Sequence, residues 1–439
     1  MFGGIIMKIG LYLQDYRKNT EKEFNNTLAV VKNAKIDLLV FPETCYTPFY
    51  SDFYNNDIEN EVDNVKVRDK AFEISEHTGC AVIIGGEDKY GMVYSVFANA
   101  YSRDEETETA LYYKHTAAGD SPLGFDNYGE DVELSFQWVQ LKEKRIGMTI
   151  CYDCNHAAFS RAYFKAGVDI LINSTGGNVV YNKWYRYNKV RAIENKCFNF
   201  CTMGYNKERD KLNKENSYTF GFTPQGKLMK GTLLMEGSSI GNIAVYDTDN
   251  APNGFEDDRG LNQTETPNAK GNYSLVISKL NDVLASAKSI AQNLWTLSVG
   301  KENLIICAVD GENVLKPEKV LSLLYHAKLK DIPNKRYLII NRWDKLDMNF
   351  YNTILSDVLK VRSMENYCAV LLTTNGFTKC YQCGMNRTAQ TVAAENGVYN
   401  LDFGRMSGPE VIWKDKPGMM KANWRKGYEK LIEYLEEIK

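Results

Sequence analysis

The sequence of 439 residues has little histidine, no marked excess of either charge and no long hydrophobic run. It contains four histidines, and its 53 Lys and Arg residues nearly balance 56 Asp and Glu residues, which gives a formal net charge of −3. Nucleic acids and anionic membranes attract concentrated positive charge, so this balance indicates neither as a partner. No apolar run approaches the roughly 20 residues that cross a bilayer.

The N-terminus and the cysteines are unlike those of a secreted protein. The first segment, MFGGIIMKIGLYLQDY, has no basic region ahead of its apolar stretch, which a signal peptide requires. The ten cysteines lie mostly in apolar segments and are too few for a disulfide scaffold. We therefore expect buried thiols in a cytoplasmic protein.

Strand-like and helix-like patterns alternate along the chain, and this alternation predicts an α/β fold. Hydrophobic residues make up 44% of the chain and charged residues 25%, as in an ordinary globular protein, and the length favours two or three domains. Buried strands are expected where apolar residues run together, among them 7–13, 36–41, 80–84, 145–150 and 168–173. Helices are expected over 21–33, 66–78, 158–166 and 184–196.

A change of composition separates the chain into two parts. Residues 248–272 are rich in Asn, Asp, Gly, Pro and Thr and almost free of aliphatic side chains, which is typical of a linker or long loop. The alternation then restarts, with a helix expected over 282–297 and further strands and helices after it. We predict one domain over 7–248, a linker over 249–272 and a smaller α/β domain over 273–439. No internal repeat is evident in the sequence.

Three predicted strands of the first domain end in reactive side chains. Glu43 follows the apolar segment IDLLVF, Lys114 follows a strand that ends in two tyrosines, and Cys151 follows GMTI. Ligands of α/β sheets bind at the carboxyl ends of the strands. We therefore expect an acid, an amine and a thiol to converge at one site.

Such a trio provides a nucleophile together with the groups that activate it. A thiol with a pKa of about 8.5 is mostly protonated at neutral pH. The Glu43 carboxylate can accept its proton, and the Lys114 ammonium favours the thiolate and an oxyanion formed after attack. Glu43 can then protonate a leaving amine and deprotonate a water molecule. This set needs no histidine base, which fits the low histidine content.

These segments, in this order, resemble the nitrilase (carbon–nitrogen hydrolase) superfamily. The resemblance covers about residues 7–248. It rests on FPE at 41–43, YYKH at 112–115, GMTICYD at 147–153, Trp184 with RAIEN at 191–195, and TPQG at 223–226.

The resemblance implies an α-β-β-α sandwich and assigns a role to each member of the trio. Glu43 is then the general base, Lys114 the stabiliser of the transition state and Cys151 the nucleophile, with the backbone N–H of Tyr152 as a second oxyanion donor. The loop 174–178 is expected to border the substrate pocket. The resemblance implies no cofactor or metal, and it implies a homodimer or larger homo-oligomer. Substrate-binding residues are expected at Tyr152, Asp120, Asn173 and Trp184.

Two parts of the sequence depart from the family's pattern. Asn-His-Ala at 155–157 stands shortly after the nucleophile, where many members have Pro-Glu. Many members also have a second Glu after the lysine; here Asp120 is the nearest acid by spacing, and Glu130 is the alternative. The segment 117–129, with its Gly and aromatic residues, is expected to line the pocket.

Several other motifs have two interpretations. Cys154, three residues after the candidate nucleophile, could form a redox pair with it or be incidental. Cys380 and Cys383 could be half of a zinc site, but no second pair lies nearby, so buried thiols are favoured. The segments 310–313 and 341–344 each follow a strand of the second domain. They could form a ligand site at that sheet's edge or be ordinary turns.

We therefore expect an amidohydrolase that cleaves a small amide or N-carbamoyl substrate through a thioester on Cys151. Nitriles and the glutamine side chain suit the same trio, so the substrate stays open. Two alternatives also stay open. One is a sensor or interaction protein that acts through its C-terminal domain, and the other is transfer of the acyl group to an amine instead of water.

Overall fold

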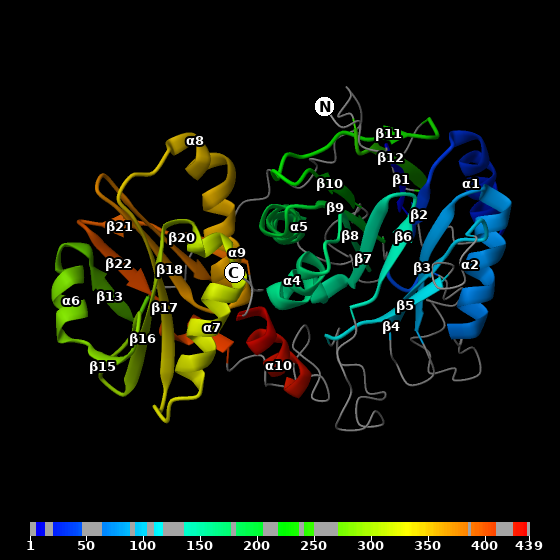
Figure 1. Ribbon diagram of the computed structural model, residues 1–439. Helices are drawn as coiled ribbons and strands as arrows, with labels where there is room; N and C mark the ends of the chain where they lie inside the picture. Colours follow the sequence, from blue (N-terminus) through cyan, green and yellow to red (C-terminus); the bar gives the residue numbers. More distant parts are fainter. Residues whose placement is uncertain are drawn as a thin grey trace. The chain divides into compact units, whose positions relative to one another are not determined.

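The chain forms two compact units, which we call the first and the second unit (Figure 1). The first comprises Met1–Leu261 and Lys416–Gly427, and the second comprises Asn262–Asp415 and Tyr428–Lys439. A computed structural model describes residues 6–13, 21–45, 64–87, 93–102, 109–116, 136–176, 181–204, 218–236, 241–249, 271–384, 388–409 and 425–436.

The described residues of the first unit form two β-sheets. One sheet has seven strands, in the order β11 (Thr232–Leu233), β12 (Asn242–Asp247), β1 (Lys8–Leu13), β2 (Leu38–Val40), β3 (Ala81–Glu87), β4 (Val93–Ala98) and β5 (Thr109–Tyr113). The other has five, in the order β10 (Tyr218–Phe222), β9 (Phe198–Met203), β8 (Ile170–Thr175), β7 (Lys144–Ile150) and β6 (Trp138–Leu141).

Helices cover the outer faces of both sheets, while the inner faces pack against each other (Figure 1). The helices of the seven-stranded sheet are α1 (Glu21–Ala34) and α2 (Asn64–Thr78), and those of the five-stranded sheet are α4 (Ala157–Lys165) and α5 (Tyr181–Asn195). The predicted α/β fold and α-β-β-α sandwich are thus confirmed.

Strands between two layers have to be apolar on both faces, and β2 illustrates this. All three of its residues are buried, and it lies between β1 and β3 with parallel pairing to both. On the outer side of this sheet Leu28 and Val31 of α1 join a core with Ile74 of α2. The continuous apolar segment around β2 therefore places the residues that follow it at the carboxyl edge of the sheet.

The second unit has a three-layer arrangement. Its large sheet consists of β14 (Lys288–Ala291), β15 (Leu294–Val299), β16 (Glu302–Asp310), β17 (Lys335–Trp343), β18 (Ala369–Thr374), β19 (Thr378–Cys383) and β20 (Ala389–Val392), in that order. A small sheet consists of β13 (Tyr273–Val276), β22 (Val398–Leu401) and β21 (Ala394–Glu395). The helical elements are η5 (Ile277–Lys279), α6 (Leu280–Ser286), η6 (Gly311–Leu315), α7 (Pro317–Lys328), α8 (Met348–Phe350), η7 (Tyr351–Leu355), α9 (Ser356–Glu365), η9 (Phe403–Arg405) and the part of α10 (Arg425–Glu436) from Tyr428 onward.

Two cores lie on the two faces of the large sheet, and the alternation along β17 shows the division. Tyr337 and Ile339 point into the core shared with α7 and α9, whereas Leu338 and Ile340 point into the core shared with the small sheet. Successive side chains of a strand point to opposite faces, so an unbroken apolar run supplies both cores.

The helix predicted over 282–297 is wrong. Only Leu280–Ser286 is helical, and the chain then forms the antiparallel hairpin of β14 and β15. Asn293 lies at the turn with φ +60°, a conformation that asparagine tolerates better than most residues. The alanines favoured a helix in the sequence pattern, but pairing of β15 with β16 gives these residues a sheet to join.

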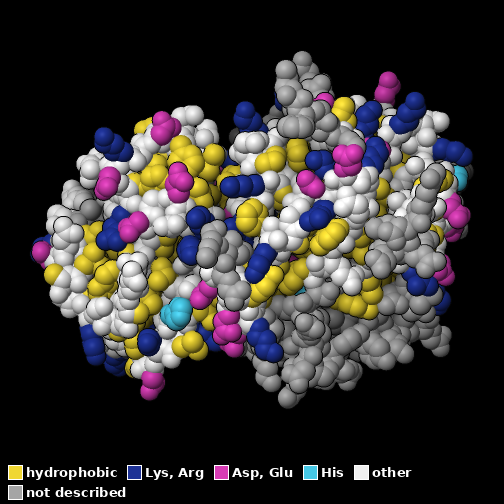
Figure 2. Space-filling model, viewed as in Figure 1, with side chains coloured by type: hydrophobic (Ala, Val, Ile, Leu, Met, Phe, Trp, Pro, Cys, Tyr) yellow, Lys and Arg dark blue, Asp and Glu magenta, His cyan; other side chains and the backbone are white. Residues whose placement is uncertain are grey.

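The predicted domain boundaries stay a prediction, because most of the linker predicted over 249–272 lies outside the described residues. Among the residues that the structure describes, no helix is long and apolar enough to cross a membrane. On the face shown in Figure 2, basic and acidic side chains are interspersed among the described residues. This mixture agrees with the near balance of charge in the sequence.

Candidate active site

Glu43 lies just beyond β2, and both of its carboxylate oxygens accept hydrogen bonds. Oε1 accepts from Lys114 Nζ at 2.5 Å, and Oε2 accepts from the Gly176 backbone N–H at 2.7 Å. The side chain is buried. Contacts to both oxygens fix the plane of the carboxylate, so its orientation is set by elements of both sheets.

Lys114 lies just beyond β5 and is almost completely buried. Its backbone N–H donates to the Val93 carbonyl at 2.8 Å, which continues the pairing of β5 with β4. Burial by itself lowers the pKa of the ammonium group, but the interactions with Cys151 and Glu43 outweigh burial and raise the pKa of Lys114. The side chain is therefore a permanent cation at neutral pH.

Cys151 follows β7 directly and begins the short helix η4 (Cys151–Asn155). Its φ of +48° lies in the left-handed region, which costs a residue with a Cβ roughly 1–2 kcal/mol. Backbone strain of this kind clusters at functional sites, where the surrounding structure holds it in place. The turn ends the strand at Ile150 and leaves the thiol at the carboxyl edge of the sheet.

The environment of Cys151 keeps its thiol protonated at rest. Burial raises its pKa, the Glu43 carboxylate raises it further, and the Lys114 ammonium opposes both; the net result is a pKa well above the usual value. The thiol also lies within hydrogen-bonding range of Glu43. The structure thus brings the three predicted residues together as a thiol, a carboxylate and an ammonium ion.

Asp153 is a fourth ionisable residue of this region, and it was not among the predicted site residues. Its carboxylate accepts from Tyr112 Oη at 2.8 Å and from the His115 backbone N–H at 3.1 Å. Burial raises its pKa to about 6, although the Lys114 ammonium and these hydrogen bonds lower it. Because its partners flank Lys114, Asp153 links the turn after β7 to the end of β5.

A signal for Asp153 was present in the sequence. It stands two residues after Cys151, and Tyr112 and His115 stand two residues before and one residue after Lys114. A buried carboxylate needs hydrogen-bond donors, and Tyr112 and His115 provide them on either side of Lys114. The contact of Gly176 with Glu43 left no such signal in the sequence, because Gly176 contributes a backbone N–H and not a side chain.

Asn173 lies behind the nucleophile, on β8. Its Nδ2 donates to Thr149 Oγ1 at 3.1 Å and to the Cys151 carbonyl at 3.4 Å. Its Oδ1 accepts from Thr175 Oγ1 at 2.9 Å and from Cys201 Sγ at 3.4 Å. These contacts support the strained turn, and the predicted contact of Asn173 with substrate stays a prediction.

The RAIEN segment forms a buried ion pair beneath the same turn. Arg191 Nη1 lies 2.5 Å from Glu194 Oε1, and Arg191 Nε donates to the Cys154 carbonyl at 2.8 Å. Asn195 Nδ2 donates to the Arg191 carbonyl at 2.9 Å. This cluster ties α5 to η4 and fixes the helix that follows the nucleophile.

Tyr152 and Trp184 pack edge to face, with ring centroids 5.0 Å apart. Trp184 is fully buried and its Nε1 donates to Thr175 Oγ1 at 3.1 Å. The Lys183 ammonium lies 4.9 Å from the Tyr152 ring centroid and 5.3 Å from that of Trp184. Trp184 thus supports the residue next to the nucleophile, and its predicted role in substrate binding stays a prediction.

Several predicted pocket residues lie outside the described residues. They are Asp120, Glu130, the segment 117–129, and residues 177 and 178 of the loop expected to border the pocket. The described part of that loop, Ser174–Gly176, reaches the site through the Gly176 N–H on Glu43.

The remaining cysteine motifs are buried in the two units. All ten cysteines of the chain are buried and outside disulfides, as the sequence analysis expected. Burial raises the pKa of Cys154 and raises that of Cys380, to about 12 for the latter. Cys380 and Cys383 both lie on β19, and among the described residues no group of three or more His, Cys, Asp or Glu side chains could hold a metal ion.

The arrangement can carry out nucleophilic acyl chemistry. A protonated thiol, a fixed carboxylate that can take its proton and a fixed ammonium ion beside both are the components that attack on a carbonyl requires. Since Lys114 and Glu43 are already paired in the resting state, little reorganisation is needed when charge develops.

The carbon–nitrogen hydrolase family profile matches residues 9–244. Similar solved structures include an amidase from Nesterenkonia sp., with 16% identity, a TM-score of 0.42, and coverage of 55% of this chain and 89% of that one. Nit3 from Saccharomyces cerevisiae, a member of branch 10 of the nitrilase superfamily, has 15% identity, a TM-score of 0.42, and coverage of 55% and 90%. A carbon–nitrogen hydrolase from Helicobacter pylori G27 has 13% identity, a TM-score of 0.41, and coverage of 55% and 88%. A comparison with curated proteins gives no match.

The family match spans more than half of the chain; it begins within β1, includes all of β7 and ends within β12. It confirms the resemblance that the sequence motifs indicated. The chain belongs to the carbon–nitrogen hydrolase family of the nitrilase superfamily, and it is a hydrolase of carbon–nitrogen bonds other than peptide bonds.

Proposed function

We propose that this protein is an amidohydrolase that cleaves a small amide or N-carbamoyl compound through a thioester on Cys151. The observation that carries the proposal is the buried contact of Lys114 with Glu43, 2.5 Å long, beside the Cys151 thiol. Its substrate is a small molecule, and the active form is a homodimer or larger homo-oligomer in the cytoplasm.

Acylation begins when Cys151 Sγ attacks the carbonyl carbon of the substrate and its proton passes to the Glu43 carboxylate. The negative charge on the carbonyl oxygen is stabilised by the Lys114 ammonium and by the Tyr152 backbone N–H. The carbon–nitrogen bond breaks, the nitrogen takes the proton from Glu43, and ammonia or an amine leaves. The acyl group remains on sulfur as a thioester.

Deacylation repeats these steps with water. Glu43 takes a proton from a water molecule as its oxygen attacks the thioester carbon, and Lys114 again stabilises the oxyanion. The carbon–sulfur bond breaks, the thiolate recovers the proton from Glu43, and the carboxylic or carbamic acid leaves. The two hydrogen bonds to Glu43 keep one carboxylate aligned for both half-reactions.

A panel of small amides and N-carbamoyl compounds, read by ammonia release, tests this proposal. We expect turnover of at least one class by the full chain, a trapped acyl adduct on Cys151 by mass spectrometry, and no turnover by Cys151→Ala. Cys307→Ala, which removes a buried thiol of the second unit, serves as the matched control and should retain turnover. Equal ammonia release by the Cys151→Ala variant would contradict the mechanism.

The same panel distinguishes the alternatives. A sensor or interaction protein would release no ammonia from any compound. An amide transferase would give a new amide when an amine such as hydroxylamine is added, at the expense of the free acid. We expect the acid to remain the main product.

A further inference from the structure

The large sheet of the second unit repeats the five-stranded sheet of the first. Strands β6 to β10 lie in sequence order, with antiparallel pairing at both ends and two parallel pairings between them. Strands β15 to β19 have the same order and the same four orientations. The connecting helices correspond as well, with α7 in the place of α4 and α9 in the place of α5 (Figure 1).

The register of the parallel strands is also the same in both sheets. Ile150, the last residue of β7, pairs with Ser174 of β8. In the second unit Asp310, the last residue of β16, pairs with Arg342 of β17. The residue that follows the strand end is Cys151 in one unit and Gly311 in the other.

The turn after this strand has one geometry in both units. Cys151 has φ +48° and begins η4, and Gly311 has φ +50° and begins η6. An asparagine of the next strand holds the turn in each case. Asn173 Nδ2 donates to the Cys151 carbonyl at 3.4 Å, and Asn341 Nδ2 donates to the Gly311 carbonyl at 3.0 Å.

The buried ion pair behind the turn recurs with its partners. Arg362 Nη1 lies 2.5 Å from Glu365 Oε1, and Arg362 Nε donates to the Val314 carbonyl at 3.0 Å. Asn366 Nδ2 donates to the Arg362 carbonyl at 2.9 Å. These contacts repeat those of the cluster of Arg191, Glu194 and Asn195. The segments RAIENKC at 191–197 and RSMENYC at 362–368 share four of seven residues.

We propose that the second unit contains a second copy of the half of the hydrolase fold that carries Cys151, with Gly311 in the nucleophile's place. The copy has no hydrolase chemistry, so that each chain has one reactive centre, in the first unit. The structural copy follows from strand order, register and buried contacts, whereas the single reactive centre also depends on the proposed function.

The copy retains what builds the turn and has lost what performs the reaction. The asparagine behind the turn and the Arg–Glu–Asn cluster are present in both units. The thiol is absent at Gly311, and Asn313 stands where the first unit has the buried carboxylate of Asp153. The asparagine and the Arg–Glu–Asn cluster are present in a unit that has no nucleophile at this turn. We therefore assign them a structural role, and a chemical role to the residues that differ.

The layer that provides the acid and the amine has no counterpart among the described residues of the second unit. In the first unit Glu43 and Lys114 come from the seven-stranded sheet, which packs on the inner face of the five-stranded one. In the second unit the three-stranded sheet of β13, β22 and β21 shares the core on that face. Even a thiol at position 311 would therefore lack the partners that activate Cys151.

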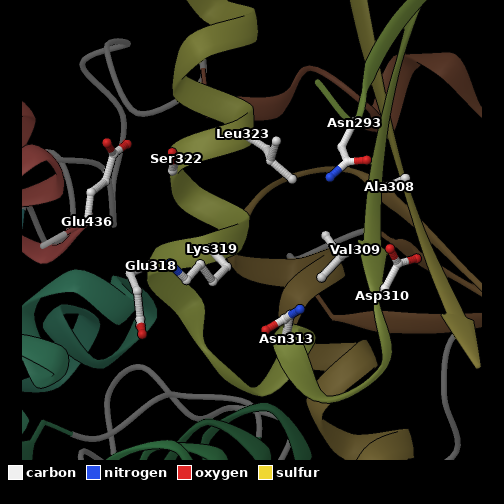
Figure 3. A pocket seen from close by; sticks show the side chains of 10 residues that line it. All are labelled: Asn293, Ala308, Val309, Asp310, Asn313, Glu318, Lys319, Ser322, Leu323 and Glu436. Atoms are coloured by element: carbon white, nitrogen blue, oxygen red, sulfur yellow. The ribbon is translucent and has the colours of Figure 1, made fainter. Parts of the chain in front are cut away.

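Core packing near the turn has also diverged. In the first unit Phe159 and Tyr163 of α4 are buried, and a Cβ at Gly147 would lie 2.7 Å from the Tyr163 ring. The corresponding residues of α7 are Lys319 and Leu323, and they line a cavity of about 340 Å³ between α7 and the end of β16 (Figure 3).

Hydrogen exchange on the full chain tests the structural equivalence. Asn341→Ala removes the donor to the Gly311 carbonyl, and we expect at least tenfold faster exchange of peptides covering 311–316, with those covering 151–156 unchanged. Asn173→Ala should give the reverse pattern. The control Asn349→Ala alters an exposed asparagine of the same unit and should change neither. If Asn341→Ala does not fold, Asn341→Asp, which loses the same donor at equal size, replaces it.

Two outcomes would overturn the proposal. Unchanged exchange at 311–316 in the Asn341 variant would mean that the two turns are not held in the same way. More than one acyl group per chain during turnover, or ammonia release by Cys151→Ala, would mean that the second unit has its own reactive centre. If the wild type turns over no compound at all, the proposed function fails, while the exchange result still decides the structural copy.

Discussion

The Lys114 ammonium and the Glu43 carboxylate form a buried ion pair, with Nζ 2.5 Å from Oε1. Removing two charges from water is costly, and a buried pair is weak evidence for stability alone. This pair lies beside a thiol whose pKa is raised, and it comes from the ends of two strands that are not neighbours in their sheet. In the proposed mechanism, these groups stabilise the charge that the reaction generates between them.

Glu43→Gln should change turnover and thiol reactivity in opposite directions. The amide cannot accept the thiol proton, so kcat for ammonia release should fall by roughly 10²–10⁴. The carboxylate raises the pKa of Cys151, so its loss should lower that pKa and shift the alkylation of Cys151 by iodoacetamide to lower pH. Both are measured on the purified full chain.

The matched control for this variant is Glu143→Gln, which makes the same change at an exposed position in the turn between β6 and β7. It should alter neither measurement. A parallel fall of turnover and alkylation in Glu43→Gln would indicate local disruption of the site instead of loss of a base.

Gly176→Ala should lower turnover with little effect on unfolding. A Cβ at this position would lie 3.0 Å from Glu43 Oε2, tighter than most contacts of a Cβ, so the carboxylate has to shift by a few tenths of an ångström. Small displacements of a catalytic group reduce rates strongly, and we expect kcat to fall by about tenfold or more. Gly376→Ala, where nothing lies within 4 Å of the new Cβ, is the control. Equal kcat in both variants would show that Gly176 does not position Glu43.

The sequence identified the three residues that the structure brings together, but not the groups that support them. Lys114 and Cys151 each follow a strand directly and Glu43 follows one after two residues, and a buried apolar strand is the most readable local pattern. The Gly176 N–H on Glu43 could not be predicted, because every residue except proline carries such a donor. The role of Asn173 depends on the register of β7 against β8, which no local pattern specifies.

The repeat in the second unit could not be predicted from the sequence for a different reason. The repeat lies in strand order, register and a few buried polar contacts, while most side chains differ between the two copies. RSMENYC alone is too short to indicate a repeat, and the helix wrongly predicted over 282–297 concealed the strand β15, which begins it. Pairing of β15 with β16 determined the secondary structure of that segment and outweighed the local preference of alanine for helix.

Asp153→Asn should alter the pH dependence of stability in a defined direction. The pKa of Asp153 is about 6 in the folded protein against 3.8 ordinarily, so between these values the folded state holds a proton that the unfolded state has lost. The stabilisation from this proton is present below pH 4 and is lost as the pH rises through 6. Asparagine cannot titrate, and it is the residue that the second unit has at this position.

Urea unfolding of both proteins at pH 5 and pH 7 provides the measurement. The stability of the variant relative to the wild type should rise by about 1 kcal/mol from pH 5 to pH 7. Exposed Asp249→Asn is the control and should show no such change. A difference that stays constant with pH would mean that Asp153 does not titrate in this range.

Lys114→Met should slow both turnover and alkylation, in contrast to the glutamate variant. The ammonium lowers the pKa of Cys151, so its removal should shift alkylation to higher pH, and loss of the oxyanion donor should lower kcat by roughly 10²–10³. The variant leaves Glu43 buried without its cation, which can cost 3–5 kcal/mol, so folding is checked by circular dichroism at low temperature. Lys114→Arg keeps the charge in another geometry and should restore alkylation more than turnover. If alkylation were unchanged in Lys114→Met, the ammonium would not be acting on the thiol, and its contact with Glu43 would be structural alone.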